Sequence, residues 1–488
     1  MNGRRARRCF GVGLAAAALM LSACASDVPP GKFVGIGAYG ARGAATGGGA
    51  VQNQGGAAGP LGGGSSVRGG STAGATSGAN PGSGGGTGSS QQGGGGGANS
   101  GGNAVSGVKA GSCAGFQNTT GITSSTITLA NVSDVSGPIP GLFTSAQQAA
   151  KAYVAYFNST SSICGRKLKL TDLDSQTNSI GDQDAATSAC GGAFAMVGSM
   201  SAFDNGGAKT VTDCGIPDLR AITTTPERTA APVSFGTDSI NSPQVTTAQY
   251  TYLKSAAGDA YLHAGIIYLD AGAAVPNAIA DKKAAEAVGY KFAFDQAVAV
   301  TTFNYAPYAA QISNAGVKFL QYTGAYQFAI RLKQALDQQG VKVTFLMDSV
   351  AYDPAFITSG GSAVDGTYSF VNTALFEEAA RNPEMQAYLH WLNQVAPGGV
   401  PSFFGIYAWG AMKLFTQLAV QLGGQLTRSS LLNAIRGVHS YTGSGLFTTQ
   451  DVGGKKTPPC QAMIQLEGGH WVRRGTSPYI CGSVVNTA

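Results

Sequence analysis

The sequence predicts an α/β fold with two Rossmann-like lobes and a ligand cleft between them, preceded by a disordered Gly-rich tether. Short apolar runs alternate with amphipathic stretches at helical spacing in two series, one before residue 215 and one after residue 262. Repeated βα units of this kind are typical of parallel, doubly wound sheets. Residues 113–488 are also too many for one ordinary hydrophobic core, which favours two lobes.

The N-terminus has the layout of a secretory signal peptide, which we place at residues 1–23. "MNGRRARRCFGVGLAAAALMLSAC" joins a four-arginine start to an apolar stretch that is short for a membrane span, with small residues before Cys24. "LSAC" resembles a bacterial lipobox, so we expect lipidation of Cys24 and anchoring to the outer face of the cell membrane. A simple cleaved signal with an incidental Cys24 is the alternative. Arg7 and Arg8 leave both the general secretory and the twin-arginine export routes open.

Residues 24–112 form the expected lipid-anchored, disordered linker. The tract from Pro29 to Ser112 is rich in Gly, Ser, Ala, Asn and Gln, and it contains no acidic residue. Such a composition cannot bury enough apolar surface to fold. A chain of roughly 80 residues of this kind spans about 50 Å on the scaling for Gly-rich coils. We therefore expect a domain held away from the membrane by a tether.

Charge and histidine usage exclude several classes of function. The formal net charge is +6, and Arg4, Arg5, Arg7 and Arg8 lie in the expected signal. The rest of the chain has no basic run, so no nucleic-acid partner is expected. The four histidines have no partners at metal-ligand spacing, and no metal or other cofactor is expected.

Six cysteines remain after the two N-terminal ones, an even number that suits an oxidising compartment. Six cysteines allow fifteen pairings. Because each sequential pair would bracket one supersecondary unit, we expect the bridges Cys113–Cys164, Cys190–Cys214 and Cys460–Cys481.

The elements follow one another as βα units. In the first series, strand-like runs at 126–132, 167–174 and 193–199 precede helical stretches near 142–158, 182–190 and up to 212. In the second series, strands are expected at 263–270, 290–300, 317–324 and 341–348, with helices at 274–288 and 326–340. The apolar stretch 403–424 is long enough to suggest a membrane span, but Lys413 and Gln417 interrupt it, which favours a buried helix.

Hydroxyl side chains gather where two apolar runs end. "AFAMVGSMS" at 193–201 ends in Ser199 and Ser201, and "AITTTPE" at 221–227 contains Thr223, Thr224 and Thr225. Ligands of open α/β sheets bind beyond the carboxyl ends of strands, where hydroxyls and backbone N–H groups can bind a carboxylate. The alternative is that these residues only cap helices.

The order of several motifs resembles the type 1 periplasmic-binding-fold receptors of ABC importers, specifically the leucine/isoleucine/valine-receptor branch. The resemblance covers about residues 124–470. It depends on the motifs "ITLANVSDVSGPIPG", "LKLTDLDSQTN", "VGSMSA", "ITTTPE", "VKFLQYTGAYQFAIRLKQALDQQGVK" and "YTGSGLFTTQDVGG". One departure is "DAGAAV" at 270–275, which lacks the usual Asp-x-x-Tyr-Gly and its tyrosine.

The resemblance implies roles for particular residues. In the family, hydroxyls of the first lobe bind the α-carboxylate of an amino acid, and an acid and a tyrosine of the second lobe contact the ligand. These roles fall on Ser199, Ser201, Thr223 and Thr225, with Thr224 as a substitute, and on Asp348, Tyr326, the aromatic walls Phe143 and Phe404, and Asp270 as a second acid. Asp348 as a simple helix N-cap is the alternative reading.

The resemblance also implies a function and a division into lobes. We expect an extracytoplasmic solute-binding lipoprotein of an ABC importer that closes on a small amino acid or related carboxylate or amide and delivers it to a membrane permease. A ligand-sensing or adhesion module of the same fold is the alternative. No Gly-x-Ser-x-Gly follows a strand, so no enzyme is expected. Lobe 1 is placed at about 113–240 and 372–440, lobe 2 at about 241–371 and 441–488, with hinges near 235–245, 365–375 and 438–445.

Overall fold

The computed structural model describes residues 107–487. The expected signal peptide, the lipobox cysteine Cys24 and nearly all of the expected tether lie outside these residues.

Lobe 1 is built on a five-stranded parallel sheet in the order β2-β1-β3-β4-β5. Strands β3, β4 and β5 are buried on both faces, as expected for a sheet with helices on either side. The strands are β1 (Thr126–Ser133), β2 (Lys167–Asp174), β3 (Ala195–Val197), β4 (Asp218–Ile222) and β5 (Ser234–Asp238). The expected first series of βα units is therefore confirmed.

The helices of lobe 1 begin at residues suited to capping. Asn178, Thr225, Ser402 and Thr427 each accept a hydrogen bond from a backbone N–H of the following first turn. The helices are α1 (Thr144–Thr160), α2 (Ser179–Gly192), α3 (Asn205–Cys214), α4 (Pro226–Ala230), α10 (Pro383–Val395), α11 (Phe403–Leu422) and α12 (Arg428–Arg436), with the short 3₁₀ turns η5 (Phe376–Arg381) and η6 (Gly423–Gln425).

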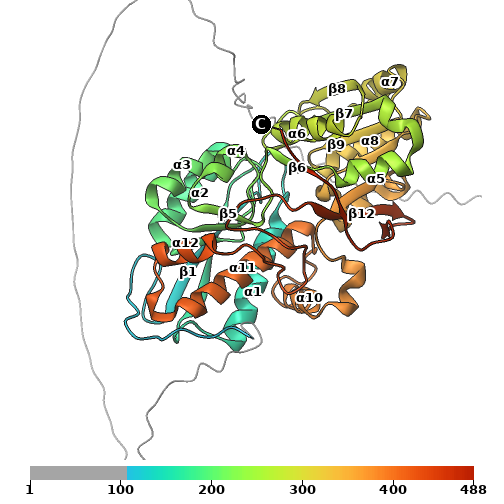
Figure 1. The fold of residues 1–488 in the computed structure, drawn as a ribbon. Helices are drawn as coiled ribbons and strands as arrows, with labels where there is room; N and C mark the ends of the chain where they lie inside the picture. Colours follow the sequence, from blue (N-terminus) through green and yellow to red (C-terminus); the bar gives the residue numbers. More distant parts are fainter. Residues whose placement is uncertain (1–106, 488) are drawn as a thin grey trace, which may run out of the picture. The chain divides into compact units, whose positions relative to one another are not determined.

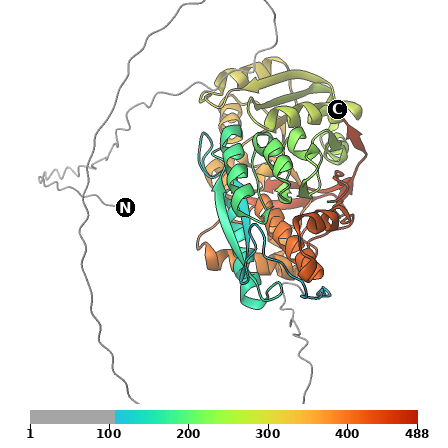
Figure 2. The same cartoon turned by 90° about the vertical axis from the view of Figure 1, so that its left-hand side faces the viewer.

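Helix α11 is the buried helix of lobe 1. It packs against α1, β4 and β5, and both views show α11 and α12 beside elements from the first part of the chain (Figure 1, Figure 2). Trp409 and Phe415 are fully buried, and Lys413 forms an ion pair with Glu384 of α10. The expectation of a buried helix is confirmed. Within residues 107–487, no helix has the length and apolar character needed to cross a membrane.

Lobe 2 contains a larger sheet in the order β13-β12-β11-β10-β9-β7-β8, with β14 paired to β12. The strands from β7 to β11 are parallel, whereas β12 and β13 extend the sheet in antiparallel fashion. They are β7 (Ala264–Leu269), β8 (Phe292–Val298), β9 (Phe319–Thr323), β10 (Thr344–Met347), β11 (Tyr368–Val371), β12 (Cys460–Glu467), β13 (His470–Arg474) and β14 (Ile480–Cys481). A separate pair joins β6 (Gln244–Thr246) to β15 (Val484–Asn486).

The helices of lobe 2 connect its parallel strands. Figure 1 shows α6, α7 and α8 grouped around β7, β8 and β9. The helices are α5 (Ala248–Ala256), α6 (Ala274–Ala287), α7 (Ala306–Asn314), α8 (Tyr326–Gln338) and α9 (Pro354–Gly360), with the 3₁₀ turns η2 (Gly258–His263), η3 (Ser349–Ala351) and η4 (Gly361–Val364).

The chain passes between the two lobes three times. The first crossover follows β5 and the second follows β11. The third lies later than the expected boundary near residue 440, because residues 441–456 still contact lobe 1. The hydroxyl of Tyr441 donates to the carbonyl of Gly410 at 2.8 Å, and Phe447 stacks on Tyr407 with ring centroids 4.6 Å apart. The chain therefore leaves lobe 1 near Thr457, just before β12.

Three disulfides join the cysteines in the expected sequential pairs, Cys113–Cys164, Cys190–Cys214 and Cys460–Cys481. The first fixes the segment before β1, and the second ties α2 to α3. The third joins β12 to β14 within lobe 2.

Candidate ligand-binding site

A cavity of about 240 Å³ is lined by residues of both lobes, and we call it the interlobe cavity. Lobe 1 contributes the segments after β1, β3 and β4 and the start of α11. Lobe 2 contributes the segments after β7, β9 and β10 and part of α6. The carboxyl ends of parallel strands thus face the cavity from both sides, which is where ligands of open α/β sheets bind.

The two lobes touch directly at the edge of this cavity. The backbone N–H of Ala273 in lobe 2 donates to the carbonyl of Ala202 in lobe 1 at 2.9 Å. The neighbouring Gly272 has φ +52°, and a Cβ added there would lie 2.7 Å from the oxygen of Ala202. Glycine at 272 therefore permits both the left-handed backbone and the close approach of the lobes.

The lobe 1 wall is mainly aromatic and aliphatic. Phe143, just before α1, and Phe404, in the first turn of α11, both line the cavity, with ring centroids 4.7 Å apart in an edge-to-face arrangement. Phe203 and Met200, in and beside the loop after β3, line it as well. The expected aromatic residues Phe143 and Phe404 thus lie at the cavity. This wall suits an apolar ligand surface.

Of the three threonines that follow β4, two line the cavity and one lies in the interior of lobe 1. Thr223 and Thr224 line the cavity. The Thr223 hydroxyl accepts from Thr229 at 3.0 Å, and the Thr224 hydroxyl donates to the carbonyl of Ser201 at 2.6 Å. Thr225 does not line the cavity, since it is the N-cap of α4 and its hydroxyl accepts from a backbone N–H of that helix. The helix-capping alternative therefore describes Thr225.

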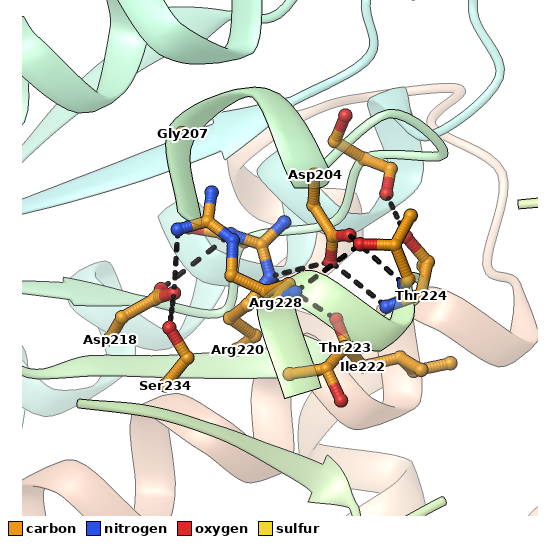
Figure 3. A network of polar contacts seen from close by, with 12 residues as sticks. Asp204, Gly207, Asp218, Arg220, Ile222, Thr223, Thr224, Arg228 and Ser234 are labelled. Carbon is orange, nitrogen blue, oxygen red and sulfur yellow. Dashed lines mark hydrogen bonds and ion pairs between the residues drawn. The ribbon is translucent and has the colours of Figure 1, made fainter. Parts of the chain in front are cut away.

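Asp204 holds this threonine segment in place (Figure 3). Its carboxylate accepts from the backbone N–H groups of Thr224 and Thr225 at 2.9 and 3.0 Å, and from the Thr225 hydroxyl at 2.6 Å. The guanidinium of Arg220 lies 3.5 Å from the same carboxylate and 3.6 Å from that of Asp218. Three acceptor contacts and a cation compensate the burial of Asp204.

The ion-pair network continues beneath the sheet ends, and its five charged side chains are fully buried. Arg228 lies 2.8 Å from Asp182 and 3.4 Å from Asp218. Figure 3 shows Arg220 and Arg228 side by side between the acidic groups. Burial raises the pKa of Asp182, although Arg228 opposes the shift. This network does not line the cavity; it supports the segment that does.

Ser199 and Ser201 lie in the interior of lobe 1 and do not line the cavity. The Ser199 hydroxyl accepts from the backbone N–H of Val132 at 3.1 Å. The Ser201 hydroxyl donates to the carboxyl of Asp134 at 3.0 Å, which also accepts from Ser175 at 2.5 Å. Burial raises the pKa of Asp134 to about 6. Both expected ligand hydroxyls therefore join neighbouring strand ends instead.

The lobe 2 acid expected from the sequence lies at the cavity. Asp348 lines it and is also the N-cap of η3, accepting from the backbone N–H of Val350 at 3.0 Å, so the N-cap alternative is confirmed and the contact with a ligand stays a prediction. Burial raises its pKa to about 7. Asp270 is exposed and Tyr326 packs against Phe356, and neither lines the cavity.

Sequence reasoning missed a second acid, Asp281 of α6. It lines the cavity, and its carboxyl accepts from the side-chain amide of Gln321 at 2.8 Å, while Gln321 accepts from the hydroxyl of Tyr250 at 3.0 Å. Burial raises the pKa of Asp281 to about 8, and the nearby Asp348 adds to the shift. Six amide side chains that line the cavity were also missed: Asn241, Gln244, Gln249, Asn277, Asn372 and Gln461.

Comparison with known proteins identifies a family. Residues 126–468 match the family described as periplasmic binding protein. No curated protein matches the chain.

Three solved structures illustrate the likeness of fold. The fatty acid ABC transporter substrate-binding protein from Thermomonospora curvata is 17% identical with a TM-score of 0.66, over 75% of this chain and 95% of its own. A solute-binding protein of an ABC transporter from R. palustris, in complex with benzoate, is 17% identical (TM-score 0.62; 74% and 99%). The branched-chain amino acid transporter substrate-binding protein from Streptococcus pneumoniae, in complex with isoleucine, is 16% identical (TM-score 0.59; 72% and 100%). The chain belongs to the periplasmic binding protein family and has its type 1 fold.

Proposed function

We propose that this protein is the extracytoplasmic solute-binding component of an ABC importer. The observation that carries the proposal is the cavity lined from both lobes, with the lobes touching at Ala202 and Ala273. A ligand held by both lobes favours the closed arrangement by its differential affinity for it. The closed protein then presents a surface that the membrane permease recognises, and permease subunits are its expected partners.

The signal and the lipobox extend this proposal to the cell surface. Export followed by lipidation of Cys24 would anchor the protein to the outer face of the membrane, with the Gly-rich tract as a tether. Mass spectrometry of the mature protein tests this part. The expected N-terminal peptide begins at a diacylated Cys24, and a Cys24→Ser variant should be released from membranes.

The proposed ligand is a small amino acid or a related carboxylate or amide. Relatives of the same fold are described as binding fatty acid, benzoate or isoleucine, each an apolar body with a polar head. The interlobe cavity offers the same division, because aromatic side chains line it from lobe 1 and carboxyl and amide side chains from lobe 2.

A ligand panel tests the proposal. The purified protein, with disulfides intact, is heated with amino acids, amides, urea and small carboxylic acids. A ligand at about 100 times its Kd stabilises the folded state by roughly 2.7 kcal/mol, which raises the midpoint measurably. Small-angle scattering should show that the protein becomes more compact with any ligand that raises the unfolding midpoint. Binding without compaction would contradict closure, and a permease-deficient strain that imports the ligand normally would contradict transport.

A further inference from the structure

The charged residues that line the interlobe cavity are both acidic. Asp281 and Asp348 lie on the lobe 2 side, and among the described lining residues there is no Lys, Arg or His. The lobe 1 side presents Phe143, Phe203 and Phe404 instead. The cavity is thus apolar from one side and bears two carboxyl groups on the other.

Within residues 107–487, neither carboxyl has a cationic partner. The Asp281 carboxyl accepts from Gln321 at 2.8 Å, and that of Asp348 accepts from the N–H of Val350 at 3.0 Å. These are neutral donors, and burial of a carboxylate without a cation is costly. In keeping with this, burial holds the pKa values of Asp281 and Asp348 at about 8 and about 7.

The titratable groups around the pair do not supply the missing cation. Tyr250 of α5 donates to Gln321 at 3.0 Å and also lies beside Asp281, as a neutral hydroxyl. The lysines that follow Asp281 on α6 are engaged elsewhere, Lys282 with Asp295 at 2.7 Å and Lys283 with the carbonyl of Thr487 at 2.6 Å.

Lobe 1 offers little to a ligand carboxylate. Ser199, Ser201 and Thr225 lie away from the cavity, and the Thr224 hydroxyl gives its proton to the carbonyl of Ser201. The Thr223 hydroxyl lies 3.0 Å from that of Thr229, whose single proton is shared between Thr223 and the carbonyl of Thr225. A carboxylate in this cavity would therefore meet two acidic side chains and a single threonine hydroxyl of this segment.

We infer that the cavity selects a small organic amine with an apolar body and no carboxylate, whose ammonium lies between Asp281 and Asp348. This inference rests on the proposed solute-binding function, and it assigns a ligand class other than the amino acids, carboxylates and amides proposed above. An ammonium has three donors, which suit two carboxylates. The aromatic rings of lobe 1 hold the apolar body and favour a cation nearby.

Four matched probes test the inference: 2-phenylethylamine, phenylalanine, 3-phenylpropanoate and 2-phenylethanol. They share the ring and differ in the polar group. Calorimetry with the wild-type protein should show the amine binding at least about tenfold more tightly than each of the others. A tighter acid or amino acid would overturn the inference.

Substitutions of the two acids test whether their carboxyl groups bind the amine. Asp281→Asn and Asp348→Asn should each weaken the amine by about tenfold or more, because each removes one charged acceptor. Asp270→Asn is the matched control, since Asp270 is an exposed acid at the end of β7 that does not line the cavity. Amine affinity that survives both cavity substitutions would also overturn the inference.

The wild-type protein gives an independent test through pH. The amine requires ionised carboxyls, so its affinity should rise between about pH 6 and about pH 9, as the groups titrate and while the amine stays protonated. Affinity that falls over this range would contradict the assignment.

The outcomes separate the inference from the proposed function. One outcome is that the acid or the alcohol binds with the same affinity to the wild type and to the Asn variants. That result would support a solute receptor and contradict the amine as its ligand. If no probe binds, and mass spectrometry finds no small molecule released when the purified protein is denatured, both are contradicted. A released molecule that carries a carboxylate and no amine overturns the inference alone.

Discussion

The side-chain amide of Asn372 donates to the carboxyl of Asp238 at 3.0 Å, and this bond joins the second crossover to the first. The hydroxyl of Tyr407 donates to Asn372 at 2.7 Å and accepts from Gln450 at 3.2 Å. Gln450 in turn accepts from the backbone N–H of Ser239 at 2.9 Å. One buried network therefore connects the first two crossovers with the segment that leads to the third, and Asn372 also lines the cavity.

Asp238→Asn should change how stability depends on pH. The ordinary pKa of this carboxyl is 3.8, and burial raises it to about 7 in the folded protein. The folded state keeps a proton that the unfolded state releases, so the free energy of unfolding falls as pH rises from about 4 to about 7 and then levels off. The substitution should reduce this fall by on the order of 4 kcal/mol, measured by urea unfolding across that range.

The exposed Asp270 provides the control for this experiment. Asp270→Asn should leave the decrease of the unfolding free energy with rising pH as it is in the wild-type protein. A profile for Asp238→Asn that runs parallel to the wild type would show that Asp238 does not hold its proton to neutral pH.

Gly272→Ala should weaken ligand binding more than it weakens the fold. The new Cβ would lie 2.7 Å from the carbonyl oxygen of Ala202, a contact made only when the lobes meet. Ligand affinity should fall by about tenfold or more, because the clash disfavours the closed state that binds the ligand. Gly215→Ala is the control, since Gly215 also has positive φ (+65°) but has no atom within 4 Å of an added Cβ.

Both alanine variants should lose about 1 kcal/mol of stability, because both place a side chain in the left-handed region. Calorimetry with any ligand from the panel separates them. Equal affinity in the two variants would mean that closure does not bring residue 272 against lobe 1.

Asp204→Ala should be strongly destabilising. It removes the acceptor of the backbone N–H groups of Thr224 and Thr225, and among the described residues it leaves Arg220 with one ion-pair partner, Asp218 at 3.6 Å. Breaking a buried charge network in this way costs about 3–5 kcal/mol. Guanidinium unfolding measures the loss.

An exposed ion pair provides the comparison. Asp213 pairs with Lys209 one helical turn earlier, at 2.6 Å. Asp213→Ala should change stability by less than about 1 kcal/mol. If Asp204→Ala costs no more than this, the network does not support the threonine segment as argued.

Phe404→Ala should alter the length of ligand that binds best. The substitution removes one ring of the Phe143–Phe404 pair from the lobe 1 wall. The best ligand should lose about tenfold or more in affinity, and homologues longer by one or two methylenes should lose less. Phe303→Ala is the control, because Phe303 is 75% exposed and does not line the cavity. A uniform loss across the homologues would show that Phe404 does not set the length of ligand that binds best.

Sequence patterns predicted the βα units of both lobes, because the periodicity of apolar residues is a local signal. The antiparallel extension by β12 and the late third crossover depend on contacts between distant segments, such as Tyr441 with Gly410, and local patterns do not contain them. The disulfide pairs were predictable for the opposite reason, since each closes a local unit.

The family resemblance predicted part of the site, and Thr223, Thr224 and Asp348 line the cavity. Phe143 and Phe404 line the cavity as expected, whereas Ser201 and Thr225 lie one residue away from positions that do, Ala202 and Thr224. A shift of one residue turns a side chain from a strand end into the interior. Asp281 was missed because it precedes two lysines on a helix, a pattern typical of a solvent-exposed face.

The chain passes between the two lobes three times, and this affects how the protein folds during synthesis. Helix α11 packs against β4 and β5, yet the five parallel strands of the larger sheet, β7 to β11, are encoded between β5 and α11. During synthesis or export, one apolar face of the lobe 1 sheet therefore stays uncovered until residues 403–436 emerge. We expect no fragment that ends before residue 403 to fold by itself. Assembly should be slow and dependent on chaperones, since so many pairings are distant in sequence.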